Sequence, residues 1–414
     1  MVGSTYVPRL VDATLDDLLG EFPAIFLVGP RAAGKTTTAR RYAATVVRLD
    51  REREAAAFRA DPDAALARFD EPLLLDEWQV VPTVLGAVKR AVDDDPRPRR
   101  FLLTGSVTAE HDPATWPGVG RLIRLSMYGL TQRELLGRLG NPSFIEALLA
   151  GEPPSPPPVP DDAPDLGGYV DLALQGTFPE PALRVSPSQR HHWFLTYVEQ
   201  LVGRDVTALG GPDPARLRRY LEAVASCTAG VVSDTTLLDL AGIDRKTAAG
   251  YERFLTGLYA VDVVPAWSSR RVSRLVKIPK RYITDPALAS AVLGADTRSV
   301  LRDGDVLGRL LDTFVAAQIR PELDIAASPA RRYHLRETQG RHEVDLVIEH
   351  AGRGVVAIEI KADAGPGPSA GRHLVWLRDR LGDSFLAGVV LHTGPSSYPL
   401  DDRIIAAPIC ALWS

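Results

Sequence analysis

One stretch of the chain has the residue types and spacing of a phosphate-binding loop. It fits the pattern G-x-x-x-x-G-K-[ST], follows the apolar run Ala24–Val28 and leads into an amphipathic segment, Thr36–Ala44. A loop between a buried strand and a helix turns backbone N–H groups and the positive helix end toward a phosphate. We therefore expect ATP and Mg²⁺ here, with Lys35 at the β- and γ-phosphates and the Thr36 hydroxyl on the metal. The expected nucleotide-binding residues are Gly29, Pro30, Arg31, Ala32, Ala33, Gly34, Lys35, Thr36, Thr37 and Asp76.

Two carboxylates, Asp76 and Glu77, end the apolar run Leu73–Leu75. Ligands of parallel sheets bind at the carboxyl ends of the strands, which places both side chains at the expected edge. Asp76 would hold Mg²⁺, through a water molecule, and Glu77 would polarise the attacking water. The competing interpretation is an Asp–Glu pair that only ends a strand and starts a helix.

Small hydroxyl residues follow the apolar run Phe101–Leu103, and an arginine follows further on. Ser106 is the first candidate to position the water or sense the γ-phosphate, and Thr104 is the second. Arg121 would neutralise transition-state charge, in cis or from a neighbouring subunit. A plain strand-to-turn junction and a surface arginine are the alternatives.

A second group of chemically capable residues lies near the C-terminus. Asp345 stands in a strand-like run, and Glu359 and Lys361 share one face of another because they are two residues apart. Two carboxylates beside a lysine suit metal-assisted phosphodiester hydrolysis, with Asp345 and Glu359 on Mg²⁺ and Lys361 polarising the water. Asp312, on a predicted helix, would add a third carboxylate. A fold without nuclease activity and an ordinary salt-bridged strand remain alternatives.

The middle of the chain carries a helix-turn-helix pattern at residues 234–257, with a turn at Gly242 and a helix cap at Asp244. A strand-like run and a basic stretch follow, which together resemble a DNA-contacting wing. The alternative is a helical domain that binds a protein. The expected nucleic-acid contacts are Arg245, Lys246, Arg270, Arg271, Arg274, Lys277, Lys280 and Arg281.

The elements that must position these residues divide the chain into segments. Short apolar runs alternate with helical patterns over residues 24–139, which indicates an α/β domain with a parallel sheet. Residues 151–168 are rich in proline and predict a linker. We therefore expect a nucleotide-binding domain at 1–150, a mostly helical region at 169–299, and an α/β domain at 300–414.

The composition limits the classes of function. The 414 residues carry a net charge of −4, so nucleic-acid binding would need a local basic patch. Two distant cysteines make neither a disulfide framework nor a four-ligand metal site, and no apolar run approaches the roughly 20 residues of a membrane span. We therefore expect a cytoplasmic protein that does not enter membranes. Only six of the 48 basic residues are lysines, and Lys35 and Lys361 are two of them.

Several motifs together resemble the AAA-type ATPases of bacteria and archaea that have an accessory C-terminal region. The resemblance lies in GPRAAGKTT, LLLDEW, FLLTGS and GRLIRLSMYGLTQREL, and further on in Gly176–Glu180, Arg204-Asp205 and Lys280–Leu288. It covers nearly the whole chain and implies an AAA+ P-loop module, a winged-helix-like middle region and a nuclease-like end. The order of helix, strand, strand and E-x-K at the end resembles the PD-(D/E)xK nuclease superfamily, of restriction-endonuclease-like fold. That fold implies that Asp312, Asp345, Glu359 and Lys361 lie together, although the helix acid is aspartate here instead of the commoner glutamate.

The sequence thus predicts an Mg²⁺-dependent ATPase whose nucleotide state is coupled to DNA binding and to metal-dependent nucleic-acid cleavage. A second hypothesis is an ATP-dependent switch that binds a protein partner and has an inactive nuclease-like domain. A third is an ATP-binding assembly module with negligible turnover. The oligomeric state stays open, since an arginine given to a neighbour would require a homo-oligomer.

Overall fold

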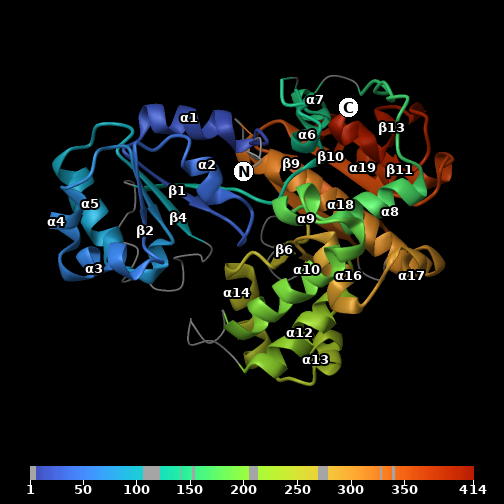
Figure 1. The fold of residues 1–414 in the computed structure, drawn as a ribbon. Helices are drawn as coiled ribbons and strands as arrows, with labels where there is room; N and C mark the ends of the chain where they lie inside the picture. The colour runs from blue at the N-terminus through green and yellow to red at the C-terminus, as the bar shows by residue number, and fades with distance from the viewer. Residues whose placement is uncertain are drawn as a thin grey trace. The chain divides into compact units, whose positions relative to one another are not determined.

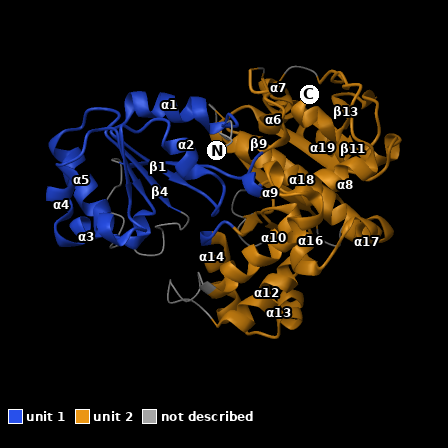
Figure 2. Ribbon diagram, in the orientation of Figure 1, with its two compact units in different colours: residues 1–130, 178–180, 257–259 blue, residues 131–177, 181–256, 260–414 orange. Residues whose placement is uncertain are grey.

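The computed structural model describes residues 6–105, 122–140, 142–151, 154–204, 213–268, 278–326, 329–337 and 341–414. Its contacts divide the chain into two compact units, which Figure 2 colours separately. Unit 1 comprises residues 1–130, 178–180 and 257–259, and unit 2 comprises residues 131–177, 181–256 and 260–414. Within the described residues, no helix is both long and apolar enough to cross a bilayer.

Unit 1 is built on a five-stranded sheet in the order β2-β3-β4-β1-β5, in which every described pairing is parallel. The predicted parallel α/β sheet is therefore confirmed. The strands are β1 (Ala24–Val28), β2 (Thr45–Arg48), β3 (Leu73–Asp76), β4 (Phe101–Gly105) and β5 (Leu122–Ser126). The helices are α1 (Val11–Glu21), α2 (Lys35–Ala39), α3 (Glu52–Ala60), α4 (Pro62–Leu66) and α5 (Val84–Asp94), with a 3-10 turn, η1, at Trp78–Val80.

Alternation along the strands sends side chains to both faces of this sheet. Ala24, Phe26 and Val28 of β1 pack in one apolar cluster with α3, α4 and α5, while α1 contacts β1 and β5. All five residues of β1 are buried, as a central parallel strand requires. Helix α2 is shorter than the predicted Thr36–Ala44, because the chain turns at Arg41 and Tyr42 to begin β2 at Thr45.

Unit 2 contains a mixed six-stranded sheet in the order β12-β13-β11-β10-β9-β8 and a two-stranded antiparallel sheet of β6 and β7. The strands are β6 (Val261–Val264), β7 (Lys280–Ile283), β8 (Ala330–Arg336), β9 (Glu343–His350), β10 (Gly354–Ile360), β11 (Phe385–His392), β12 (Tyr398–Asp401) and β13 (Ile404–Pro408). Strand β10 pairs antiparallel with β9 and parallel with β11.

The helices of unit 2 are labelled in chain order in Figure 1, together with its strands. They are α6 (Gln132–Leu135), α7 (Phe144–Ala150), α8 (Leu166–Gln175), α9 (Pro179–Leu183, which begins in unit 1), α10 (Pro187–Glu199), α12 (Pro214–Ser226), α13 (Asp234–Ala241), α14 (Arg245–Gly257, which ends in unit 1), α16 (Pro286–Leu293), α17 (Thr297–Arg302), α18 (Gly304–Ile325) and α19 (Arg372–Leu381). A π-helical turn, η3, covers Gln200–Arg204, and 3-10 turns cover η5 (Pro368–Gly371), η6 (Gly382–Ser384) and η7 (Ile409–Trp413).

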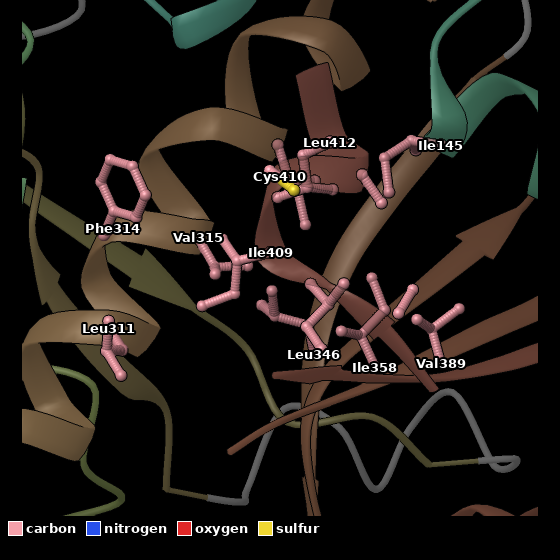
Figure 3. Packing of buried hydrophobic residues seen from close by; sticks show 14 of the residues in the cluster. Ile145, Leu311, Phe314, Val315, Leu346, Ile358, Val389, Ile409, Cys410 and Leu412 are labelled. Carbon is pink, nitrogen blue, oxygen red and sulfur yellow. The ribbon is translucent and has the colours of Figure 1, made fainter. Parts of the chain in front are cut away.

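The long helix α18 is fixed against the six-stranded sheet by apolar packing. Figure 3 shows Leu311, Phe314 and Val315 of this helix in one buried cluster with Leu346, Ile358 and Val389 of the strands. Helix α19 covers the other face, where Leu374 and Leu377 pack with Val347 and Val390. The sheet therefore lies between two helical layers, and α18, which carries Asp312, contacts β8 and β10.

The proline-rich segment at 151–168 does not separate two cores. Its described part before α8 has no helix or strand, but Val159 and Ala163 pack against the α18 cluster. Helices α7 and α8, on either side of it, bury residues in that same cluster. The contacts instead divide the chain after Leu130.

Candidate functional site

The phosphate loop joins β1 to α2 at the carboxyl edge of the parallel sheet. Gly29 has φ of 150°, and a Cβ there would lie 1.9 Å from the Met127 carbonyl oxygen, so only glycine fits. Gly34 has φ of 97° and caps α2. The backbone thus needs glycine at both ends of the loop, which is a structural reason for the motif.

Lys35 is 6% exposed and folds back onto the loop. Its ammonium donates to the carbonyl oxygens of Gly29 at 2.9 Å and Pro30 at 2.7 Å. Burial lowers the pKa of Lys35 to about 8, although Glu77 and Asp76 oppose that shift. The lysine is therefore charged at neutral pH, and its described acceptors are two neutral carbonyls, which a phosphate can replace.

Asp76, at the end of β3, is the centre of a hydroxyl cluster. One of its carboxylate oxygens, Oδ1, accepts from Thr36 Oγ1 at 2.7 Å and from Thr104 Oγ1 at 2.6 Å. Strand β4 lies between β1 and β3, and Thr104 stands directly beside Asp76 in the register. The Arg48 guanidinium lies 3.9 Å from the other oxygen. Thr104, the second of the two hydroxyl candidates, thus contacts Asp76, while Ser106 and Arg121 fall outside the described residues.

Glu77 leaves the strand in a left-handed backbone conformation, with φ of 57°. Such a conformation costs a non-glycine residue roughly 1–2 kcal/mol and re-aims the side chain relative to a continued strand. Glu77 is partly exposed and accepts a hydrogen bond from the Gln79 amide. Its carboxylate lies near Lys35, whose pKa it raises.

Arg9 is a contributor to this site that the motifs do not reveal. Its buried guanidinium donates to the Ala33 carbonyl of the loop at 2.8 Å. It also donates to the carbonyls of Tyr128 at 2.7 Å and Gly129 at 3.0 Å. Arg9 therefore ties the loop to the segment that follows β5.

The C-terminal acids come together in unit 2 from α18, β9 and β10. The β9–β10 ladder ends at Leu346 and Ile358, so Asp345 and Glu359 follow at the same end of both strands. The backbone N–H of Ile360 donates to Asp345 Oδ2 at 2.9 Å, and Lys361 Nζ donates to Glu359 Oε2 at 2.7 Å. Within the described residues, no three His, Cys, Asp or Glu side chains converge closely enough to hold a metal.

Asp312 does reach this cluster, but it is held by Lys280, for which the basic stretch predicts a nucleic-acid contact. Lys280 Nζ donates to Asp312 Oδ2 at 2.5 Å and lies 3.5 Å from Asp345 Oδ1. The Tyr282 hydroxyl donates to Asp312 Oδ1 at 3.0 Å. Lys280 and Tyr282 are two residues apart on β7, a spacing that places them on one face and could have indicated this role.

Burial and neighbouring charges set the ionisation of this cluster. Burial raises the pKa of Glu359 to about 8, with Asp345 adding to the shift and Lys361 opposing it. Burial raises the pKa of Asp312 to about 6, against the effect of Lys280. Burial alone would lower the pKa of Lys280, but the Asp312 and Asp345 charges outweigh it and the net pKa is raised. Asp312 and Lys280 are therefore both charged at neutral pH.

A cavity of about 340 Å³ opens onto part of this cluster. Asp312, Asp345 and Lys361 line it, together with Arg309 and Arg336 from its walls. Arg309 pairs with Asp305 at 2.8 Å, and Arg336 lies 3.6 Å from Glu343. The cavity is thus lined by charged groups that are already paired.

The residues predicted to contact nucleic acid differ in their exposure. Arg245 and Lys246 are exposed at the start of α14, the second helix of the predicted helix-turn-helix. Lys280 and Arg281 are instead buried, because β7 pairs with β6 and Arg281 is bonded to Glu252 and Asp234. They do not form the exposed wing that the basic stretch predicts. Arg270, Arg271, Arg274 and Lys277 lie outside the described residues.

Comparison with protein families matches three parts of the chain. Residues 21–136 match a family described as "AAA domain". Residues 167–299 and 307–412 match two domains of unknown function, DUF8612 and DUF4143. With its parallel sheet and phosphate loop, the first part is an AAA-type P-loop domain of ATPase-like architecture.

Two mycobacterial proteins are similar over almost the whole chain. They are the uncharacterized proteins Rv2008c of Mycobacterium tuberculosis and Mb2031c of Mycobacterium bovis. Each is 29% identical over 403 residues, which is 96% of this chain and 82% of the relative. Among solved structures, the Walker-type ATPase PABY2304 of Pyrococcus abyssi aligns with a TM-score of 0.39 and 14% identity, over 68% of this chain and 94% of that one.

Proposed function

We propose that the chain hydrolyses ATP with Mg²⁺ at the carboxyl edge of the unit 1 sheet. The observation that carries this proposal is the contact of Thr36, from the phosphate loop, with Asp76 and Thr104, from the two neighbouring strand ends. A hydroxyl and a carboxylate at hydrogen-bond distance are the ligands that Mg²⁺ uses beside a bound nucleotide. The donor set therefore fits the metal.

Each residue of the site has a separate role in the proposed hydrolysis. The Lys35 ammonium exchanges its loop carbonyls for phosphate oxygens and offsets the charge that develops during transfer. Thr36 and Asp76 would hold Mg²⁺, which neutralises phosphate charge when bound. Glu77 orients the attacking water and accepts its proton, while Gln79 holds the Glu77 carboxylate.

Steady-state hydrolysis of Mg-ATP by Lys35→Met tests this proposal. We expect the turnover to fall by about 100-fold or more, since the loss of one charge-stabilising donor costs about 10²–10³ in rate. Lys89→Met is the matched control, because Lys89 lies in the same unit and pairs with Asp93 on the surface of α5. Equal turnover by wild type and Lys35→Met would reject hydrolysis at this site and favour an assembly module.

A second activity, metal-dependent phosphodiester cleavage at the C-terminal acids, is supported by one orphaned atom. Glu359 is 3% exposed, and its buried Oε1 has no hydrogen-bond partner among the described residues. Such an atom costs free energy unless a cation or water satisfies it. Asp345 and Glu359 would hold the metal, which activates water when bound, and Lys361 would orient the phosphate or water.

Nicking of plasmid DNA with Mg²⁺ or Mn²⁺ tests this second activity. Glu359→Gln and Lys361→Ala should each abolish nicking, while Lys89→Ala, in the other unit, should nick like the wild type. Nicking that survives in both site variants would identify a contaminating nuclease. An absence of nicking in the wild type would favour the switch protein with an inactive nuclease-like domain.

The exposed Arg245 and Lys246 support DNA contact by the helix-turn-helix, in the manner of a winged-helix region. Charge removal in Arg245→Gln/Lys246→Gln should weaken binding to duplex DNA and lower its salt dependence. Arg218→Gln is a control from the neighbouring α12, since Arg218 lies 3.9 Å from the surface residue Glu199. Binding that is equal in both variants and the wild type would favour a protein partner for this region.

A further inference from the structure

We propose that Lys280 is a built-in cation of the C-terminal carboxylate site, and that the site accordingly takes one divalent cation, on Asp345 and Glu359, with Asp312 excluded as a ligand. Lys280 is then a positioning residue, which holds one acid and leaves the other two for the metal. This inference rests on the second activity proposed above. Its test measures metal binding, so it can fail or succeed independently of cleavage.

Both oxygens of Asp312 are already occupied by strand β7. Oδ2 accepts from the Lys280 ammonium at 2.5 Å, and Oδ1 accepts from the Tyr282 hydroxyl at 3.0 Å. Asp312 is 6% exposed, so a metal would have to displace a buried ion pair to reach it. Breaking such a pair is costly, because it leaves an uncompensated buried charge.

Lys280 also reaches the acid that remains available. Its Nζ lies 3.5 Å from Asp345 Oδ1 and 3.4 Å from the Asp345 carbonyl oxygen. These contacts are long compared with the one to Asp312, and the other oxygen of Asp345 is held by the Ile360 N–H. Asp345 is therefore oriented by its neighbours while Oδ1 stays only weakly engaged, beside the open cavity.

Glu359 offers the complementary ligand. One of its oxygens accepts a hydrogen bond from Lys361, and the other is buried with no partner in the described part of the chain. The described contacts thus leave one weakly engaged oxygen on Asp345 and one unengaged oxygen on Glu359, but none on Asp312. Two carboxylate oxygens with waters are enough for one divalent cation of the magnesium type.

The net charge of the cluster also favours one divalent cation. When all three acids are ionised, as binding of a cation to Glu359 requires, Asp312, Asp345 and Glu359 carry three negative charges, which Lys280 and Lys361 reduce to one. One divalent cation leaves a single positive charge, to which a phosphodiester is attracted. A second divalent cation would leave three positive charges in a site where Lys280 and Glu359 are almost fully buried, at a high electrostatic cost.

Lys280 and the acids belong to different segments of the chain. The lysine lies in residues 167–299 and the acids lie in residues 307–412, which match separate families. Strand β7 and helix α18 nevertheless meet within unit 2 at this ion pair. The site is therefore composite, and the second segment alone would lack its fixed cation.

Counting of bound Mn²⁺ by electron paramagnetic resonance tests the inference, with no nucleotide present. The full chain would carry Asp76→Asn throughout, so that the phosphate-loop metal does not contribute. We expect one Mn²⁺ in this background and none after Glu359→Gln. No bound Mn²⁺ in the background protein, or two that both depend on Glu359, would overturn the inference.

The deciding variant removes both partners, as Lys280→Met/Asp312→Asn. It keeps the local charge and avoids a lone buried ion, so it is expected to fold. One Mn²⁺ should still bind if Asp312 is not a ligand, whereas loss of Mn²⁺, as in Glu359→Gln, would overturn the inference. The single variant Lys280→Met frees Asp312 and should bind Mn²⁺ about tenfold more tightly, since a like charge has been removed. Weaker binding there would also contradict the role of a built-in cation.

Discussion

Two buried lysines, one in each unit, show opposite ways to keep a cation inside a protein. Lys35 is 6% exposed and donates to two carbonyl oxygens of its own loop. Lys280 is 2% exposed and donates to a carboxylate, with a second carboxylate nearby. Neutral acceptors hold an ammonium loosely enough to be exchanged for an anion, whereas a carboxylate compensates its charge and fixes it.

The ionisation of the two lysines follows from these partners. Burial lowers the pKa of Lys35 to about 8, because its carbonyl acceptors do not repay the loss of water. Burial acts on Lys280 in the same direction, but the charge of Asp312 reverses the net effect and raises its pKa. The first lysine is therefore suited to receiving a ligand, and the second to holding its neighbours in place.

The largest expected difference is in stability. Lys280→Met should lower the free energy of unfolding of unit 2 by about 3–5 kcal/mol, because Asp312 is left buried without its partner. Lys35→Met should change the free energy of unfolding of unit 1 by about 1 kcal/mol or less. The two hydrogen bonds are lost, but the cost of burying the ammonium charge is removed as well. Denaturant unfolding followed by circular dichroism measures both.

Lys280→Met/Asp312→Asn is the control for that difference. It should recover most of the stability that Lys280→Met loses, since neither charge then remains. Equal losses for Lys280→Met and Lys35→Met would remove the distinction between an exchangeable and a fixed cation.

A second buried ion pair, Arg133–Glu322, is expected to make the stability of unit 2 depend on pH, because the arginine only partly compensates the buried acid. Arg133 lies 3.3 Å from Glu322, yet burial raises the pKa of Glu322 to about 7 from an ordinary 4.5. A carboxyl with a raised folded-state pKa stabilises the fold below pH 4.5 and loses that contribution as the pH rises through 7. The difference between these pKa values corresponds to about 3 kcal/mol.

Glu322→Gln should therefore flatten the decline of stability between pH 5 and pH 8. Thermal or denaturant unfolding at several pH values measures this, with Asp401→Asn as the control, because Asp401 is an exposed carboxylate of unit 2 that pairs with Arg378 at 2.6 Å. Parallel profiles for the wild type and Glu322→Gln would contradict the raised pKa. A flatter profile would show that burial of Glu322 outweighs its pairing with Arg133.

In unit 1, the largest effect after Lys35 is expected for the water-activating carboxylate. Glu77→Gln should lower the turnover of ATP by about 100-fold, within the range for loss of a positioned general base. ATP binding should persist, because Lys35, Thr36 and Asp76 are unchanged. Equilibrium binding of ATP beside steady-state hydrolysis separates the two steps, and a parallel loss of binding would assign Glu77 a structural role.

The strands of unit 1 and the meeting of Thr36 with Asp76 could be predicted from the sequence for a simple physical reason. Each strand is a short apolar run that ends in polar residues, and parallel strands bring those ends to one edge. The position of Asp76 beside Thr104 then depends only on β4 lying next to β3. Local patterns therefore predict these strand-end contacts, but they do not reveal the buried Arg9 that ties the loop to the segment after β5.

The place of Lys280 could not be predicted in the same way. Residues 270–281 hold six basic residues and no acidic one, which predicts a solvated stretch. Strand β7 is nevertheless buried at all four positions, because it pairs with β6, and the charges of Lys280 and Arg281 are met by acids 29 to 65 residues away in the sequence. Tertiary partners of this kind leave no signal in the charge pattern of one segment.

The smallest expected effect would show how much the hydroxyl cluster contributes to the phosphate-loop site. Thr104→Val removes one of two hydroxyl donors to Asp76 while keeping the shape of a β-branched side chain. A hydrogen bond to a charged group contributes about 1.5 kcal/mol, so turnover should fall by about tenfold. Thr104→Ser keeps the hydroxyl and should retain most of the activity. Because Thr36 still holds Asp76 in Thr104→Val, a loss as large as that of Lys35→Met would mean that Thr104 contacts the nucleotide or its water directly. Unchanged turnover in Thr104→Val would leave Thr36 as the sole hydroxyl needed to orient Asp76.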